Sequence, residues 1–145
     1  MIWDEVYRFF SLEVLEMVDE QLFGTSVIEV IQKRLSVRTY LAQPLKPEVI
    51  EKLICFFSLI KGPFGGSPRF ELIERDSALK GKNAKLGTYG VIRGASTYVV
   101  AVVEKADKDL EDFGYSLEKA ILYATFLGLG TCCLEVLSRE VNLVK

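Results

Sequence analysis

The stretch TYVVAVVEKADKDLEDFGYSLEKAILYATFL, residues 97–127, decides the fold class. Residues 97–104 form a continuous β-branched and apolar run, which predicts a strand at the centre of a sheet, covered on both faces. Residues 107–127 predict a helix, because acidic side chains at its start complement the helix macrodipole. Apolar side chains occupy more than half of its circumference, so this helix is expected to be buried or to pack against a second subunit. The side chains expected along one side of it are Leu110, Phe113, Leu117, Ile121, Ala124 and Leu127.

The sequence before this stretch predicts further helices. Residues 4–22 carry apolar side chains at helical spacing and belong to an N-terminal helical extension, residues 1–25. A capping box at residues 26–29 starts a second helix. The inner side of that helix is expected to carry Ile28 and Ile31.

A third helix and a strand follow. Pro47 suits the first turn of a helix, because its fixed φ is helical and its missing N–H is not needed there. The apolar face expected for this helix consists of Ile50, Leu53, Ile54, Phe57 and Ile60. A short alternating strand is predicted at Arg69–Glu74. Helices and strands in this order indicate an α+β fold.

The composition limits the chemistry that the protein can do. The chain has 145 residues, 50% of them hydrophobic, which suits one domain with a buried core. It has no histidine, which excludes Ser-His-Asp and Cys-His catalysis and histidine-based zinc sites. We therefore expect no metal site and no catalytic side chain, and any chemistry is expected to come from a cofactor.

Charge and cysteine usage predict the compartment. The net charge of −2 gives no basic face for nucleic acid. The sequence contains neither a signal peptide nor an apolar run long enough to span a bilayer. Cys55, Cys132 and Cys133 fit neither a disulfide framework nor a metal site, and small buried apolar side chains are the favoured interpretation. A cytoplasmic protein that binds neither nucleic acid nor membrane is therefore expected.

The stretch Arg34-Leu-Ser36-Val-Arg38 is a candidate phosphate site. In an extended chain alternate side chains point to the same side, so both guanidinium groups flank the Ser36 hydroxyl. A solvated basic rim at the end of the preceding helix is the alternative, since basic residues are favoured there. The spacing alone leaves both interpretations open.

Two glycine-containing stretches are candidates for contact with a flat ligand. Gly65 and Gly66, within the Gly/Pro-rich residues 62–68, allow backbone conformations that let a ring approach closely. Gly128 and Gly130 remove side chains from the turn after the long helix, with the same effect. An ordinary helix-to-strand connection and an ordinary helix cap are the alternatives.

Together, these stretches resemble the flavin-dependent nitroreductase superfamily, in its branch with a Gly-Pro-Phe-Gly loop. The motifs in chain order are Arg-x-Ser-Val-Arg-x-Tyr at residues 34–40, Gly-Pro-Phe-Gly at residues 62–65, Tyr-Gly-x-Ile-x-Gly-Ala at residues 89–95 and Gly-Leu-Gly-Thr-Cys at residues 128–132. The resemblance covers residues 26–132.

The resemblance implies an α+β fold, a mixed sheet flanked by helices, that holds FMN at a homodimer interface. Arg34, Ser36 and Arg38 would bind the FMN phosphate. The other cofactor-binding residues that the resemblance implies are Pro63, Phe64, Gly65, Gly130 and Thr131. The implied reaction is ping-pong: NAD(P)H reduces the flavin, and the flavin passes hydride to an electron-poor acceptor such as a nitroaromatic or a quinone.

The C-terminal sequence departs from the superfamily pattern. Members continue Cys-Trp-Leu-Gly-Gly-Thr, whereas this chain has Cys132-Cys-Leu-Glu-Val-Leu137 and ends at Lys145. We therefore expect a truncated nitroreductase-like domain at residues 26–145, incomplete at its C-terminus. The alternative function is a non-enzymatic truncated or frame-shifted remnant that binds flavin weakly or not at all. An interaction module that works through residues 4–22 is a third hypothesis.

Overall fold

The computed structural model describes residues 26–74 and 92–133. Within these ranges the elements follow in the order α3 (Val27–Lys33), α4 (Pro47–Leu59), β1 (Arg69–Glu74), β2 (Thr97–Val102) and α5 (Asp109–Phe126). The α+β class predicted from the sequence is therefore confirmed. The predicted helix at residues 4–22 and the sequence beyond Cys133 lie outside the described residues.

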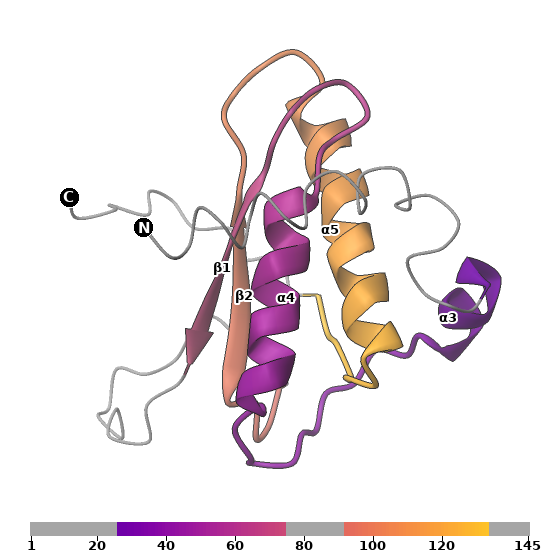
Figure 1. Cartoon of the computed structure of the whole chain (residues 1–145), viewed down its shortest axis with the longest axis vertical. Coiled ribbons are helices and arrows are strands. Elements are labelled where there is room, and N and C mark those ends of the chain that lie inside the picture. Colours follow the sequence, from indigo (N-terminus) through magenta and orange to yellow (C-terminus); the bar gives the residue numbers. More distant parts are fainter. Residues whose placement is uncertain (1–25, 75–91, 134–145) are drawn as a thin grey trace.

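The two strands form an antiparallel pair that lies beside α4 (Figure 1). The register runs from Arg69 opposite Val102 to Glu74 opposite Thr97. The bounds of β1 are those that the sequence pattern predicts. A period of two in side-chain character was enough to find this strand, because it lies at the boundary between core and solvent.

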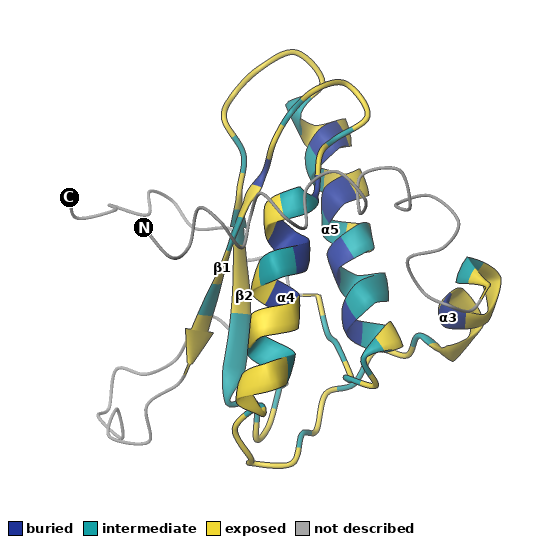
Figure 2. Ribbon diagram, in the orientation of Figure 1, coloured by how far each residue is buried: buried dark blue, intermediate teal, exposed yellow. Residues whose placement is uncertain are grey.

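The helix α4 covers one face of this sheet. Phe70 and Leu72 of β1 pack against the buried side chains of α4 and α5. Val99 and Val100 of β2 are 45% and 41% exposed, so the prediction that this strand is covered on both faces is wrong for the described residues (Figure 2). A β-branched run indicates that a segment favours the strand conformation, but the burial of the strand depends on the elements that pack beside it. Among the described residues, β2 pairs with β1 alone.

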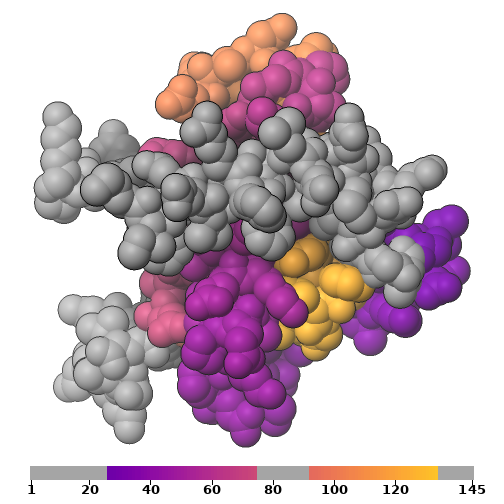
Figure 3. All heavy atoms as spheres, viewed as in Figure 1, coloured from indigo at the N-terminus to yellow at the C-terminus, as the bar shows by residue number. Residues whose placement is uncertain are grey.

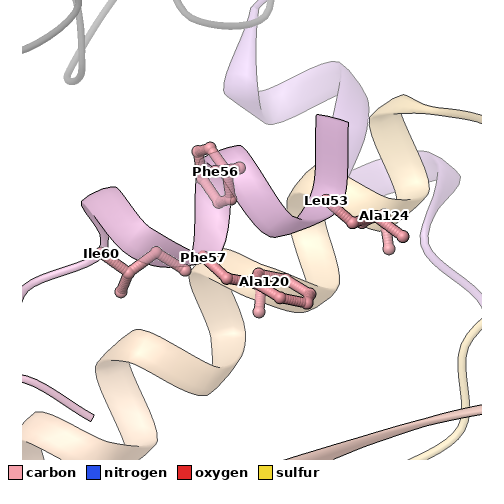
Figure 4. Packing of buried hydrophobic residues seen from close by; sticks show 6 residues of the cluster. All are labelled: Leu53, Phe56, Phe57, Ile60, Ala120 and Ala124. Carbon is pink, nitrogen blue, oxygen red and sulfur yellow. The ribbon is translucent and has the colours of Figure 1, made fainter. Parts of the chain in front are cut away.

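The hydrophobic core lies where α4 packs against α5 and β1. Its buried members are Leu53, Phe56, Phe57 and Ile60 of α4 together with Ala120 and Ala124 of α5 (Figure 4). The ring of Phe56 stacks on that of Tyr123 with 3.9 Å between centroids, and Phe57 lies against Phe70 at 5.1 Å. Burial of apolar surface, worth about 25 cal/mol per Å², is the main force that holds these elements together.

The helix α4 begins at Pro47, as predicted. Leu53 and Phe57 are buried, as expected, but Ile54 is exposed and Phe56 takes its place in the core. The stripe that faces α5 runs through positions 53, 56, 57 and 60, and position 54 lies off its edge. Apolar residues on both sides of this stripe made its centre ambiguous in the sequence.

The buried face of α5 is narrower than the composition of the helix suggests. Its buried residues recur at every fourth position: Asp112, Ser116, Ala120 and Ala124. The prediction that Leu110 lines the inner side is wrong, because Leu110 is 74% exposed. Small side chains along this stripe leave room for the aromatic side chains of α4. Neither α5 nor any other described helix has the length and apolarity needed to cross a membrane.

The helix α3 contacts α5, and its buried side chain is not one of those predicted. Val30 is buried, whereas Ile28 and Ile31 are 64% and 53% exposed. The side chain of Ser26 makes no capping hydrogen bond, and its carbonyl accepts the Glu29 N–H at 2.9 Å instead. The capping box therefore marks the start of the helix without forming its side-chain bond.

Candidate functional site

Two of the predicted binding segments lie side by side. A parallel bridge pairs Ser36 with Thr131, and the Val37 N–H donates to the Thr131 carbonyl at 2.9 Å. The Ser36 hydroxyl donates to the sulfur of Cys132 at 3.5 Å. The predicted phosphate residues and the predicted turn residues thus meet, although Ser36 and Cys132 are 96 positions apart in the chain.

A second parallel bridge extends this pairing. It joins Thr39 to Arg93. The Arg93 N–H donates to the Arg38 carbonyl, and the Tyr40 N–H donates to the Arg93 carbonyl, both at 2.9 Å. Gly94 follows with φ +75°, and a Cβ at this position would collide with the Tyr40 carbonyl. The described part of the Tyr-Gly-x-Ile-x-Gly-Ala motif is therefore fixed to the segment that carries the two arginines.

Gly130 has a packing role in this pairing. A Cβ at Gly130 would lie 2.7 Å from Cγ2 of Val37, well inside van der Waals contact. Glycine therefore lets the turn after α5 approach the extended segment. This explains the residue independently of any contact with a ring.

Two buried polar atoms lie among these residues without a protein partner. Within residues 26–74 and 92–133, Nε of Arg34 and Oγ1 of Thr131 have no hydrogen-bond partner. Buried polar groups are nearly always paired, so this site is suited to an added acceptor. Phosphate oxygens are strong acceptors that match the planar guanidinium fork. The exposed side chains of Ser36 and Arg38 lie on the same segment, so the residues present fit a phosphate group.

Tyr40 lies at the end of this segment. Burial raises the pKa of the Tyr40 hydroxyl, and Cys132 and Tyr98 raise it further. The hydroxyl therefore stays neutral, and available as a hydrogen-bond donor, across the physiological range.

The third predicted segment, the loop at residues 62–68, is held by a buried carboxylate. Asp112 of α5 is 2% exposed. Its Oδ1 accepts the Phe64 N–H at 2.8 Å, and its Oδ2 accepts the Gly66 N–H at 2.6 Å. Charge-assisted bonds of this kind are about twice as strong as neutral ones. These two N–H groups thus point into the protein.

Glycine is favoured at positions of this loop for two different physical reasons. A Cβ at Gly62 or at Gly66 would collide with the Asp112 carboxylate, so both positions require close approach. Gly65 has φ +97°, in the region that favours glycine, with no atom near its Cβ position. The loop therefore has an inner side built around Asp112 and an open outer side at Gly65.

The outer side of the loop presents an aromatic ring. Phe64 is 58% exposed. The Nζ of Lys108 lies 4.8 Å from the centroid of the Phe64 ring, within cation–π range, and 3.8 Å from Oε1 of Glu111. Pro63 beside it is also exposed. The tip Pro63-Phe64-Gly65 is the part of the loop available to a ligand.

The predicted site residues fall into two groups at opposite ends of α5 (Figure 1). The loop is tied to Asp112 in the first turn of α5, whereas Thr131 follows its last turn. A helix of 18 residues is about 27 Å long. In the space-filling view the loop and the segment after β2 gather at the top (Figure 3). One protomer therefore does not bring Pro63, Phe64 and Gly65 together with Arg34.

Residues 26–143 match the model of a protein family described as "Putative TM nitroreductase". The chain belongs to this family. Neither a curated protein nor a solved structure matches the chain. All of the cofactor-binding residues predicted from the sequence lie within the range that matches the nitroreductase family. The domain boundary after residue 25 stays a prediction.

Sequence reasoning missed the role of Asp112 in this nitroreductase-family chain. In the sequence, Asp112 is one of the acidic side chains at the start of the predicted helix, and only the favourable interaction with the helix macrodipole is expected of it. The signal that could have found it is the four-residue spacing to Ser116 and Ala120, which places the carboxylate on the buried stripe of α5.

Metal binding has no support in the described ranges. No group of three or more His, Cys, Asp or Glu side chains within them could hold a metal ion. Cys55, Cys132 and Cys133 are free thiols. Cys55 and Cys132 are half-buried and Cys133 is exposed, so the expectation that all three are buried is wrong.

Proposed function

We propose that the protein is an FMN-dependent oxidoreductase that works as a homodimer in the cytoplasm. Membership of a nitroreductase family supports the oxidoreductase class and a flavin cofactor. The observation that carries the proposal is the pairing of Ser36 and Val37 with Thr131. Arg34 and Thr131 hold buried polar atoms that lack a partner among the described residues.

Arg34 is the proposed anchor for the FMN phosphate. Its Nε is buried, and a guanidinium fork binds phosphate with two parallel hydrogen bonds. The Thr131 hydroxyl is a second buried donor, on the residue that pairs with Ser36, two positions along the segment from Arg34. Ser36 and Arg38, which are exposed on the same segment, would complete the phosphate site from the solvent side.

The flavin ring is proposed to contact the tip Pro63-Phe64-Gly65 of a second copy of the chain. Within one protomer the length of α5 separates this tip from Arg34. A two-fold dimer in which α5 helices run against each other would bring the tip of one copy to the phosphate site of the other. The exposed apolar side chains Leu110 and Tyr115 of α5 suit such a contact.

The chemistry would belong to the cofactor. When bound, FMN would carry a hydride from NAD(P)H to an electron-poor acceptor, such as a nitroaromatic or a quinone, in ping-pong order. The chain itself would anchor the phosphate, hold the ring against backbone groups and exclude water.

A flavin titration tests this function. We expect the purified protein to bind FMN more tightly than riboflavin, which lacks the phosphate, and the loaded protein to oxidise NAD(P)H. Arg34→Ala removes charge-assisted bonds worth about 1.5–3 kcal/mol and should weaken FMN binding about 10- to 100-fold, with riboflavin binding unchanged. Lys33→Ala, an exposed charge loss at the neighbouring position, is the matched control and should keep wild-type affinity.

The titration also identifies failure. Wild-type protein that binds neither flavin would contradict the proposal and favour the non-enzymatic alternative. Equal loss of FMN and riboflavin affinity in Arg34→Ala would show that Arg34 does not act on the phosphate.

A further inference from the structure

Asp112 is the one buried ionisable side chain among the described residues. It belongs to α5, yet both of its oxygens bind the loop that precedes β1: Oδ1 accepts from Phe64 and Oδ2 from Gly66. The nitroreductase-type reaction proposed above gives Asp112 no task, because this carboxylate is buried and its hydrogen bonds go to the backbone of the loop.

The loop is hydrogen-bonded around this carboxylate. Besides the two bonds to Asp112, the Gly62 N–H donates to the Gly66 carbonyl at 2.7 Å, and the Gly65 N–H donates to the Gly62 carbonyl at 3.2 Å. The N–H groups of four loop residues are therefore satisfied internally. What remains outside is the side chain of Phe64 and the open backbone at Gly65.

We propose that Asp112 is a positioning residue for flavin binding, which acts by fixing the tip Pro63-Phe64-Gly65 in the conformation that contacts the flavin ring. This inference rests on the proposed function. A tip whose conformation is fixed before the ligand arrives loses less conformational entropy on binding, and this raises affinity. Gly62 and Gly66 are small for the same purpose, since a Cβ at either position would displace the carboxylate.

The geometry requires a carboxylate at this position. Two N–H donors, from Phe64 and Gly66, face the two oxygens of Asp112. An asparagine has nearly the same shape but offers one oxygen and one NH₂ group, so one loop N–H would face another donor. Asp112→Asn therefore releases one end of the tip while it changes little else in the core.

The experiment compares Asp112→Asn with Asp109→Asn. Both substitutions remove one charge from the first turn of α5, but the hydrogen bond that Asp109 accepts comes from Ala106 and not from the loop. We expect Asp112→Asn to raise the Kd for FMN about tenfold and to change the visible circular dichroism of the bound flavin, which reports the surroundings of the ring. Asp109→Asn should leave both unchanged.

A stability control separates positioning from general weakening. Leu53→Ala lies in the core, away from the loop, and should lower the Tm without changing the Kd for FMN when measured on folded protein. Phe64→Ala removes an exposed ring and no backbone bond, so it should raise the Kd with the Tm unchanged. If Asp112→Asn fails to fold, Phe64→Ala still tests whether the tip contacts the flavin ring.

The outcomes are distinguishable. Folded Asp112→Asn with the wild-type Kd and flavin spectrum would overturn the positioning role, while the proposed function would stand. An unchanged Kd in Phe64→Ala would overturn it as well, because the tip would then make no contact with the ring. Wild-type protein without FMN affinity would overturn the proposed function and this inference together.

Discussion

Gly130→Ala tests the pairing between the turn after α5 and the segment that carries Arg34. The new methyl carbon would lie 2.7 Å from Cγ2 and 3.0 Å from Cβ of Val37. Carbon atoms in favourable contact are about 3.5–4.0 Å apart, so the overlap is about 0.8 Å or more. Val37 cannot retreat easily, because its N–H is bonded to the Thr131 carbonyl. Overpacking of this kind costs about 1–3 kcal/mol.

A double-mutant cycle measures the clash directly. Val37→Ala removes the two methyl groups nearest to position 130, and alone should cost about 1 kcal/mol at this half-buried site. We expect Gly130→Ala with Val37→Ala to be less destabilised than the sum of the single variants, by about 1–2 kcal/mol. Urea unfolding followed by far-UV circular dichroism gives the free energy of unfolding for each variant.

A glycine without neighbours serves as the control. Gly114→Ala, in the middle of α5 with no atom near its Cβ position, should stabilise the protein by about 0.5–1 kcal/mol, since alanine favours the helix. If Gly130→Ala were as stable as the wild type, or if Val37→Ala gave no rescue, the pairing of these two segments would be wrong.

Two further predictions concern hydroxyl groups, one buried and one half-buried. Ser116 is fully buried, and its Oγ has no partner among the described residues. Ser116→Ala should therefore raise the free energy of unfolding, measured in urea, by about 1 kcal/mol. A clear loss of unfolding free energy would show that the hydroxyl is hydrogen-bonded, for example to a buried water. Burial, with Cys132 and Tyr98, raises the folded-state pKa of Tyr40 above the ordinary tyrosine value of 10.0, so its stabilising contribution is complete below pH 10.0 and is lost as the pH rises through the higher folded value. Tyr40→Phe should therefore flatten the alkaline loss of Tm, and an unchanged slope would contradict this assignment.

Local patterns in the sequence were sufficient for the positions of most described elements. Pro47 marked the start of α4, and the alternation at Arg69–Glu74 gave the bounds of β1. Charge and apolar periodicity placed α5 to within two residues at its start, where Lys108 takes a left-handed conformation before Asp109. These signals are read within a few residues, so they do not depend on the rest of the chain.

Burial and site assembly depended on distant neighbours. Nothing local distinguishes Val30 from Ile31 as the residue of α3 that reaches the core. The sequence named the segments around Ser36 and Thr131 separately, and only the folded chain pairs them. Asp112 illustrates the same limit, because its partners Phe64 and Gly66 lie almost 50 positions away.

A crystal structure of the protein with FMN tests the central claim most directly. We predict the phosphate at the buried end of the Arg34 side chain, within hydrogen-bond distance of Nε and of the Thr131 hydroxyl, with the Phe64 tip of a second copy against the flavin ring. A phosphate bound elsewhere, with Arg34 Nε still unpartnered, would contradict the assignment of this site.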